Sequence, residues 1–327
     1  MRRTVLLVGI RVLCLGLGLL PFLSVGGEPP AAERSAIQAF NENRWLEGMS
    51  LARKTDITTP ELQCFVGRAY YLGRGVEKNK SEGIGWFHKA GRNGDMQAQY
   101  YLGLLYKDGD GVPSNREEAA EWFRKSANQG LLAAMHEYAM LTDNINVLER
   151  AAKNGYAKSQ SALGMFYLGK EEAPKRISEG LDWLRAAARQ GDWGSAYMLG
   201  FLLIGAGRLE VQYVDFAEGE KWLRICTEKG DLSQQGMAAL ILASAYQQGK
   251  LVAQNYPLAV KWGEKAGDLG MSLGYTTCFT AYLNGQPGVP KDLNKAARIV
   301  DKMERSRDQE TRKLAQSFRK ALNLARW

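Results

Sequence analysis

The sequence predicts an all-α protein, an α/α superhelical solenoid of about seven helix-turn-helix repeats with a helical cap at each end. Three observations lead to this fold class. Similar segments recur along the chain, most of them 36 residues apart. Glycines divide each segment into a first and a second helix, because glycine adopts the positive φ that ends a helix. Most second helices carry a Trp, which a lone helix pair could not bury, so the segments must stack.

The repeat interval is clearest at one anchor position, generally the residue before the small Gly or Ala of each first helix. Four of the six intervals between anchors are 36 residues, a regularity that chance apolar patterning does not produce. The interval of 25 residues after the third anchor predicts a unit that has lost its loop and the start of its second helix. The interval of 43 residues after the fifth anchor predicts a loop insertion around residues 210–214. The seven anchors are Val66, Leu102, Tyr138, Leu163, Leu199, Leu242 and Cys278.

The second unit shows how one repeat is built. Ala98, Leu102 and Tyr106 recur every four residues, so they share one face of a helix. Gly103 costs up to about 1 kcal/mol of helix propensity, and we expect the close approach of a neighbouring helix to compensate for it. Trp122, followed by small residues, belongs to the second helix and is expected to be buried between stacked units.

This pattern resembles the Sel-one-like repeat family, a relative of the tetratricopeptide repeats. The resemblance covers roughly residues 60–300 in seven units, one of them truncated. It implies a non-enzymatic scaffold or adaptor that binds a protein or peptide. Asn115 stands where the family commonly has Asp. The matching residues of the second unit are Ala98, Leu102, Gly103, Tyr106, Gly109, Gly111, Val112, Ala119, Trp122, Phe123, Lys125, Ala127 and Gly130.

The chain is expected to divide into four segments. Residues 27–60 form a linker and an N-terminal helical cap, residues 61–300 form the repeat array, and residues 301–327 form a basic capping helix. Caps with a polar outer face keep such an array soluble. Residues 1–26 have the layout of a secretory signal peptide, with a basic head, an apolar core and small residues at the end.

The length of the apolar core in this first segment predicts the location of the protein. It is about 14 residues long, whereas a membrane span needs about 20. We therefore expect cleavage near Gly26 or Gly27 and a periplasmic or secreted protein. The alternative is a membrane anchor formed by residues 5–25.

The net charge of +8 is concentrated at the two ends of the chain. The signal segment holds three Arg residues, and residues 302–327 carry a net charge of +5, so the body between them is neutral. A neutral body does not favour a nucleic-acid partner. The expected partner is a protein or peptide of unknown identity.

No catalytic signature, cofactor motif or metal site is visible. His88 and His136 lack Cys or carboxylate neighbours at ligand spacing. The glycine pairs recur as repeat turns with no strand before them, unlike phosphate-binding loops. A catalytic site formed by residues that are distant in sequence remains an open alternative. Cys64, Cys226 and Cys278 are expected to be buried thiols, although an intermolecular bond stays open.

The candidate partner-binding surface follows from the resemblance. In related tetratricopeptide folds, ligands lie against the first helices on the concave face. The corresponding positions lie two residues before and two after each anchor, and several are aromatic or apolar, as at binding surfaces. The alternative is that a tightly wound superhelix buries them as core. The candidates are Arg68, Tyr100, Leu104, His136, Met140, Met165, Tyr197 and Phe201.

The expected function is therefore a secreted or periplasmic scaffold or adaptor. One alternative is a periplasmic immunity protein that neutralises a secreted toxin. An alternative of another class is a cell-wall or β-lactam hydrolase. The secreted, cysteine-rich branch of the family has a Cys pair in each repeat, which this chain lacks, so the resemblance does not support the penicillin-binding activity of that branch.

Overall fold

The computed structural model describes residues 29–169, 174–205 and 211–325. The described part contains seventeen α-helices and no strand, which confirms the predicted fold class. The chain divides into two compact units, one ending at Leu102 and the other beginning at Gly103. None of the described helices is long and apolar enough to cross a membrane. The predicted signal segment lies outside the described residues.

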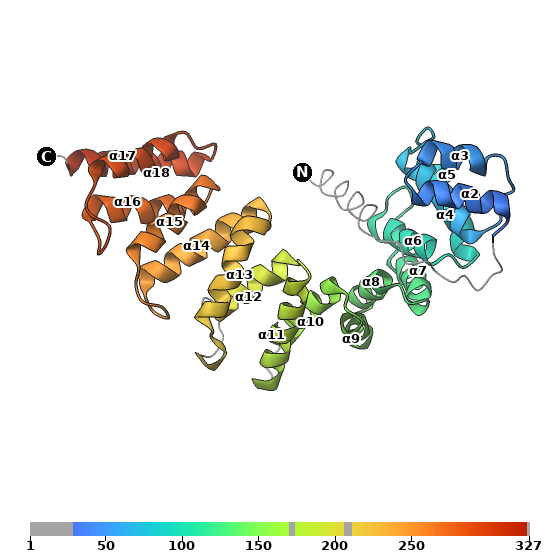
Figure 1. The fold of residues 1–327 in the computed structure, drawn as a ribbon, viewed down its shortest axis with the longest axis horizontal. Coiled ribbons are helices and arrows are strands. Elements are labelled where there is room, and N and C mark those ends of the chain that lie inside the picture. Colours follow the sequence, from blue (N-terminus) through green and yellow to red (C-terminus); the bar gives the residue numbers. More distant parts are fainter. Residues whose placement is uncertain (1–28, 170–173, 206–210, 326–327) are drawn as a thin grey trace. The chain divides into compact units, whose positions relative to one another are not determined.

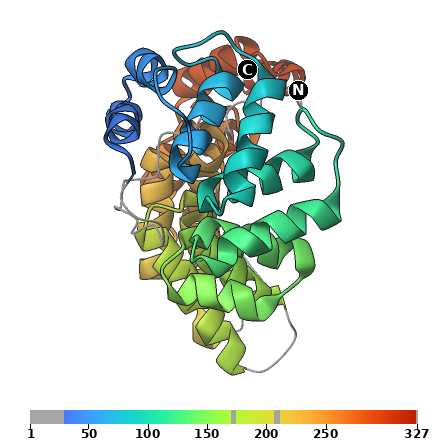
Figure 2. The ribbon, with the colours of Figure 1, turned by 90° about the vertical axis from the view of Figure 1, so that its right-hand side faces the viewer.

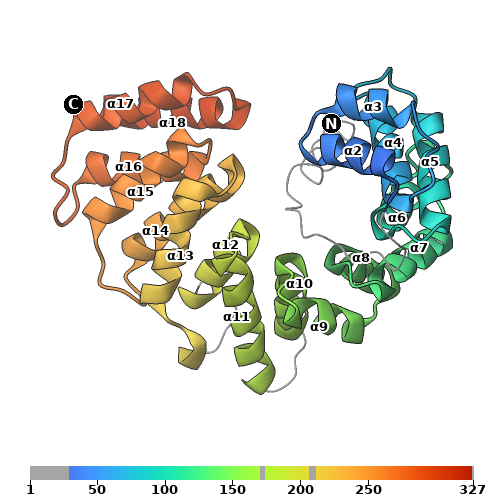
Figure 3. The same ribbon diagram turned by 45° about the vertical axis from the view of Figure 1, so that its right-hand side comes forward.

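The first unit contains the N-terminal cap and the first repeat (Figure 3). In it, α2 packs against α3, both pack against α4, and α4 packs against α5. The cap begins with α2 at residue 31, inside the segment 27–60 assigned to the linker and cap. The helices are α2 (Ala31–Asn41), α3 (Trp45–Ala52), α4 (Pro60–Leu72) and α5 (Lys80–Arg92), followed by α6 (Met96–Asp108), which continues into the second unit.

One buried carboxylate joins the cap to the first repeat. Glu33 of α2 accepts hydrogen bonds from the backbone N–H and hydroxyl groups of Thr58 and Thr59, which precede α4. Burial alone would raise the pKa of Glu33, but these hydrogen bonds outweigh it and the pKa lies below its ordinary value. The carboxylate thus ties α2 to the two residues that precede α4.

The second unit is a succession of helices, each of which contacts the next along the chain (Figure 1). The green helices α7, α8 and α9 lie in successive layers (Figure 2). The helices are α7 (Arg116–Asn128), α8 (Leu132–Thr142), α9 (Ile145–Lys153), α10 (Ala157–Gly169), α11 (Pro174–Arg189), α12 (Trp193–Leu203), α13 (Phe216–Lys229), α14 (Leu232–Gln248), α15 (Tyr256–Asp268), α16 (Ser272–Asn284), α17 (Leu293–Glu304) and α18 (Gln309–Leu324).

The two irregular repeats correspond to the two irregular intervals. The truncated unit has a second helix, α9, of nine residues, and only Asp143 and Asn144 separate it from α8. The insertion falls between α12 and α13, where the described part includes a short 3-10 helix, Val211–Tyr213. Residues 206–210 of this loop lie outside the described part.

Second helices begin at polar N-cap residues. Asn115 accepts a hydrogen bond from the backbone N–H of Glu118 at 3.0 Å. An Asp side chain offers the same acceptor, which explains why Asn can replace the common Asp at this position. Equivalent caps begin α5, α9, α13, α15 and α17, at Asn79, Asn144, Asp215, Asn255 and Asp292.

The small residues of the first helices allow close packing. A Cβ atom at Gly103 would lie 2.5 Å from the ring of Phe123, and one at Gly200 would lie 2.7 Å from Leu223. Both distances are shorter than any real contact, so a larger residue would force the two helices of the repeat apart. This confirms the predicted close approach.

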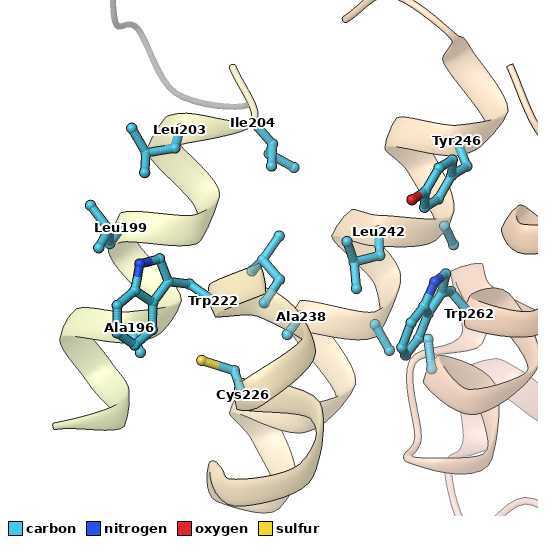
Figure 4. Close-up of a cluster of buried hydrophobic side chains, with 14 of the residues drawn as sticks. Ala196, Leu199, Leu203, Ile204, Trp222, Cys226, Ala238, Leu242, Tyr246 and Trp262 are labelled. Atoms are coloured by element: carbon cyan, nitrogen blue, oxygen red, sulfur yellow. The ribbon is translucent and has the colours of Figure 1, made fainter. Parts of the chain in front are cut away.

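The core runs continuously through neighbouring repeats. Leu199 of α12, Leu242 of α14 and the rings of Trp222 and Trp262 belong to one buried cluster (Figure 4). Trp122 is also buried, as predicted, whereas Trp86 and Trp183 at equivalent positions are half-buried. The indole N–H of Trp122, and likewise those of Trp86 and Trp222, donates to the Glu four residues before it.

Candidate protein-binding surface

The candidate surface is formed by the first helices of the second unit. On α10, α12, α14 and α16, the positions five before, two before and two after each anchor follow one helix face. We call these twelve residues the first-helix face. All twelve are exposed or half-buried, whereas the four anchors are buried. The residues are Lys158, Ser161, Met165, Gly194, Tyr197, Phe201, Met237, Leu240, Ser244, Leu273, Thr276 and Thr280.

Three apolar members of this face are exposed. The exposed fraction is 43% for Met165, 41% for Met237 and 61% for Leu273. The rings of Tyr197 and Phe201 are half-buried and stacked, with centroids 6.4 Å apart. Met140, at the equivalent position of α8, is 52% exposed. The alternative, that a tightly wound superhelix buries all of these positions as core, is therefore wrong for these helices.

Two of the exposed apolar residues were not among the candidates chosen from the sequence. Met237 and Leu273 lie five residues before their anchors, one helical turn beyond the positions chosen from the sequence. The helical period could have identified them, because positions three and four residues apart share a face. Phe166, next to Met165, is also exposed.

The sequence candidates do not all behave alike. Leu104 and His136 are half-buried, like Tyr197 and Phe201. Tyr100 is only 2% exposed, which makes it a core residue and not a contact residue for a partner. The ring of Tyr100 packs beside that of Tyr101, with centroids 6.1 Å apart, and burial of aromatic surface in such a contact is favourable.

Arg68, the remaining candidate, lies in an aromatic cluster of the first unit. Its guanidinium carbon is 5.2 Å from the ring centroid of Trp45, 5.5 Å from that of Phe65 and 6.0 Å from that of Tyr101. Cation–π contacts of this kind hold the charge against the rings. Arg68 is half-buried, and its contacts inside the first unit give it a structural role there.

From α8 to α16, the first helices are joined to each other by uncharged groups, whereas Lys107 of α6 forms an ion pair with Glu137 of α8 at 2.8 Å. Helix α14 contacts both α12 and α16, so the outward side chains form a continuous surface. The hydrogen bonds between first helices from α8 to α16 involve hydroxyl, imidazole and amide groups. They join His136 Nδ1 and Ser159 Oγ at 3.1 Å, Ser195 Oγ and Ser161 Oγ at 2.8 Å, and Thr277 Oγ1 and Gln247 Oε1 at 3.3 Å.

The second helices are joined by charged groups instead. Arg185 of α11 donates two hydrogen bonds from Nε and one Nη to the two carboxylate oxygens of Glu218 on α13. This pairing holds the pKa of Glu218 below its ordinary value. Three such links run in order from α11 to α17. They join Arg185 and Glu218 at 2.8 Å, Lys265 and Thr227 at 3.0 Å, and Lys302 and Glu264 at 2.7 Å.

The two sets of helices differ equally in composition. Helices α12, α14 and α16 contain no Asp, Glu, Lys or Arg, and α10 contains one, Lys158. Their partners α11, α13, α15 and α17 contain between four and six each. From α10 to α17, the charge of the array is therefore carried by the second helices.

The titratable groups suggested by the sequence are enclosed. Cys64, Cys226 and Cys278 are free and buried, as predicted. Burial raises the pKa of Cys226 and of Cys278 to about 12, so both thiols are protonated at neutral pH. Burial also lowers the pKa of His136. No group of three His, Cys, Asp or Glu residues with metal-site geometry occurs among the described residues.

Comparison with known proteins places this arrangement in a family. The Sel1 repeat model matches residues 60–95, 97–131, 157–192, 236–271 and 273–299, which together make up just over half of the chain. The chain belongs to the Sel1 repeat family, whose repeats generally mediate protein–protein interaction. The two repeats that the family model does not match are the truncated unit and the unit with the insertion.

Solved structures show the same fold. A protective antigen of uropathogenic Escherichia coli with an SLR fold is 22% identical, with a TM-score of 0.68; the match covers 87% of this chain and 63% of the antigen. This chain thus spans less than two thirds of that antigen. A Sel1 repeat protein from Oxalobacter formigenes is 22% identical over 94% of this chain and 98% of its own, with a TM-score of 0.59.

More distant matches carry no functional argument. An immunity protein from Pseudomonas aeruginosa is 17% identical over 76% of this chain and 88% of its own. Its TM-score of 0.38 is too low for an inference to this chain. No curated protein sequence matches significantly.

Proposed function

We propose that this Sel1 repeat protein is an exported scaffold that binds another protein through the first helices of its second unit. The observation that carries the proposal is the exposure of Met165, Met237 and Leu273 on helices whose anchors are buried. Met140 of α8 is exposed as well. Clustered apolar side chains in contact with water commonly mark interaction sites. Methionine suits such a site, because its unbranched side chain adapts to the shape of a partner.

The second helices support the proposal by their different role. Their charged links hold neighbouring repeats together on the side away from the first-helix face. The array can therefore keep its repeats in register while the first helices remain accessible. A rigid support of this kind reduces the conformational entropy that binding would otherwise cost.

Site-specific photocrosslinking in the parent cell tests this function. A photoreactive amino acid at Met165 should form a covalent adduct with the partner, and the adduct should disappear when Leu273 is changed to Glu. The matched control is Lys221, an exposed residue of the second helix α13. Adducts of equal yield at both positions, or an adduct at Lys221 alone, would contradict the proposed surface.

The export part of the proposal rests on residues 1–26. Their basic head, apolar core and small residues fit a cleaved signal peptide. N-terminal sequencing of the protein recovered from its cell should begin between Gly26 and Ala31. Intact Met1 in a membrane fraction would favour the anchor formed by residues 5–25.

A further inference from the structure

We infer that the first-helix face selects an uncharged, apolar polypeptide segment of its partner, and that it does so by excluding charged side chains. The inference rests on the proposed function and specifies the chemistry of the partner. Its basis is the distribution of ionisable residues over the second unit. Eleven of the twelve positions of the face are uncharged, and the exception, Lys158, lies on α10 at one end of the series.

The apolar members of the face determine what it can attract. Met165, Met237 and Leu273 are the most exposed apolar side chains on it, and each lies on a different helix. Covering them with apolar groups of a partner removes their surface from water, which is favourable. Helix α12, with Tyr197 and Phe201, comes between α10 and α14 in the series. A segment of polypeptide that follows the four helices could therefore cover all of these side chains in sequence.

The uncharged members determine what the face rejects. A Lys, Arg, Asp or Glu of the partner, buried against α12, α14 or α16, would lose its hydration and find no opposite charge on these helices. Burial of an unpaired charge is strongly unfavourable. Such exclusion of wrong partners is a form of specificity in its own right.

The hydrogen-bonding groups of the face point to the same chemistry. Thr276 and Thr280 donate their hydroxyl groups to backbone carbonyls within α16, and Ser161 accepts a hydrogen bond from Ser195. These polar groups are thus largely engaged within the protein. They offer a partner neutral contacts and no ion pairs, so binding should depend little on salt.

Three matched peptides test the inference. The first is an end-blocked 16-residue helix-forming peptide of Leu, Met, Ser and Gln that carries an uncharged fluorophore; the length, about 24 Å as a helix, spans several repeats. The second and third have one central Leu replaced by Lys or by Glu. Fluorescence anisotropy with the full chain should show at least about tenfold tighter binding of the uncharged peptide. Its affinity should change less than about twofold between about 0.1 M and about 0.5 M salt.

Two surface variants assign the binding to this face. Met165→Glu should weaken the uncharged peptide about tenfold and restore binding of the Lys peptide, because the new carboxylate supplies the missing counter-charge. Leu273→Glu should do the same from α16. Both positions are exposed, so the helical content and the melting temperature should stay near those of the wild type. Lys221→Glu, on the exposed side of α13, is the control and should leave all three affinities unchanged.

The outcomes separate the inference from the proposed function. If all three peptides bind equally and Met165→Glu weakens them equally, the face is a binding surface without charge selection; the inference is then wrong and the function stands. If neither Glu variant affects any peptide that binds, both are wrong. Failure of all three peptides to bind overturns the inference, while the crosslinking experiment decides the function. The inference is also overturned if the protein forms a dimer that Met165→Glu dissociates, because the face then binds a second copy of the chain. It is likewise overturned if the peptides bind only after residues 1–26 are removed, because the face then binds the chain's own N-terminal segment.

Discussion

The first and second helices of the last repeats come from the same 36-residue pattern, yet the residues that they expose to solvent differ in charge. The first helices α12, α14 and α16 lack charged residues and expose methionine and leucine. The second helices α11, α13, α15 and α17 carry the charges and use several of them to hold one repeat to the next. Both sets bury one face in the core, α11 to α15 in one cluster and α16 and α17 in the next. The comparison teaches that core formation alone does not explain the sequence of the first helices, because their outer face is apolar without being buried.

The strongest test of this comparison uses two neighbouring residues of α10. Leu163 is fully buried and Met165 is 43% exposed, although the two side chains are similar in size. Leu163→Ala should lower the free energy of unfolding by about 2–5 kcal/mol, the range for a buried aliphatic side chain. Met165→Ala should lower it by less than about 1 kcal/mol. Chemical denaturation of both variants measures the difference, and equal losses would mean that Met165 belongs to the core.

The links between repeats provide the next test. Arg185→Met should lower the free energy of unfolding by about 1–2 kcal/mol, because two charged hydrogen bonds to Glu218 are lost and water partly screens the pair. Ser195→Ala, which removes an uncharged link between first helices, should cost about 1 kcal/mol or less. Raising the salt from about 0.1 M to about 1 M should shrink the effect of the Arg185 variant only. A salt-dependent effect of the Ser195 variant would contradict the distinction between the two kinds of link.

A smaller effect is expected from pH. The hydrogen bond from Arg185 is the main reason why the pKa of Glu218 lies below its ordinary value of 4.5. The unfolded chain therefore binds a proton more readily than the folded protein, so the stabilisation is present above about pH 5 and lost as the pH falls through the lowered pKa. The difference in unfolding free energy between the wild type and Glu218→Gln should shrink from about pH 6 to about pH 3. Glu228→Gln, on the exposed side of the same helix, is the control; an identical pH dependence there would rule out the pair as the cause.

The smallest effect is expected where the two sets of helices are alike. Cys278 lies on the first helix α16 and Cys226 on the second helix α13, and both are buried in the core. Burial raises the pKa of each thiol to about 12, so neither should react with iodoacetamide at about pH 8 until the protein unfolds. Mass spectrometry of the two peptides measures this at each site. Rapid labelling of Cys278 alone would show that α16 opens toward its exposed face.

Local signals in the sequence were sufficient to predict the repeats. The anchor spacing depends on the helical period and on turns closed by glycine, both of which act within a few residues. The spacing therefore located the truncated unit at α9 and the insertion after α12. The hydrogen bonds from Thr58 and Thr59 to Glu33 escaped prediction, because they join residues 25 and 26 positions apart.

The candidate surface was predictable only in part. The same period placed Met140 and Met165 on an accessible face, but it could not reveal that Tyr100 is buried at an equivalent position. Burial at that position depends on the packing of one particular ring, which the repeat pattern does not specify. The charged links also escaped prediction, since a bond such as that between Arg185 and Glu218 spans 33 residues and two repeats.

Methionine oxidation of the native protein is the most direct test of the central claim, that the first-helix face is open to water. Mild hydrogen peroxide converts accessible methionines to sulfoxides, and mass spectrometry gives a rate for each residue. Met140, Met165 and Met237 should oxidise rapidly, whereas Met135 and Met303, both buried, should oxidise much more slowly. If Met165 and Met237 instead oxidise as slowly as Met303, the face is closed within the folded protein and cannot be its binding surface.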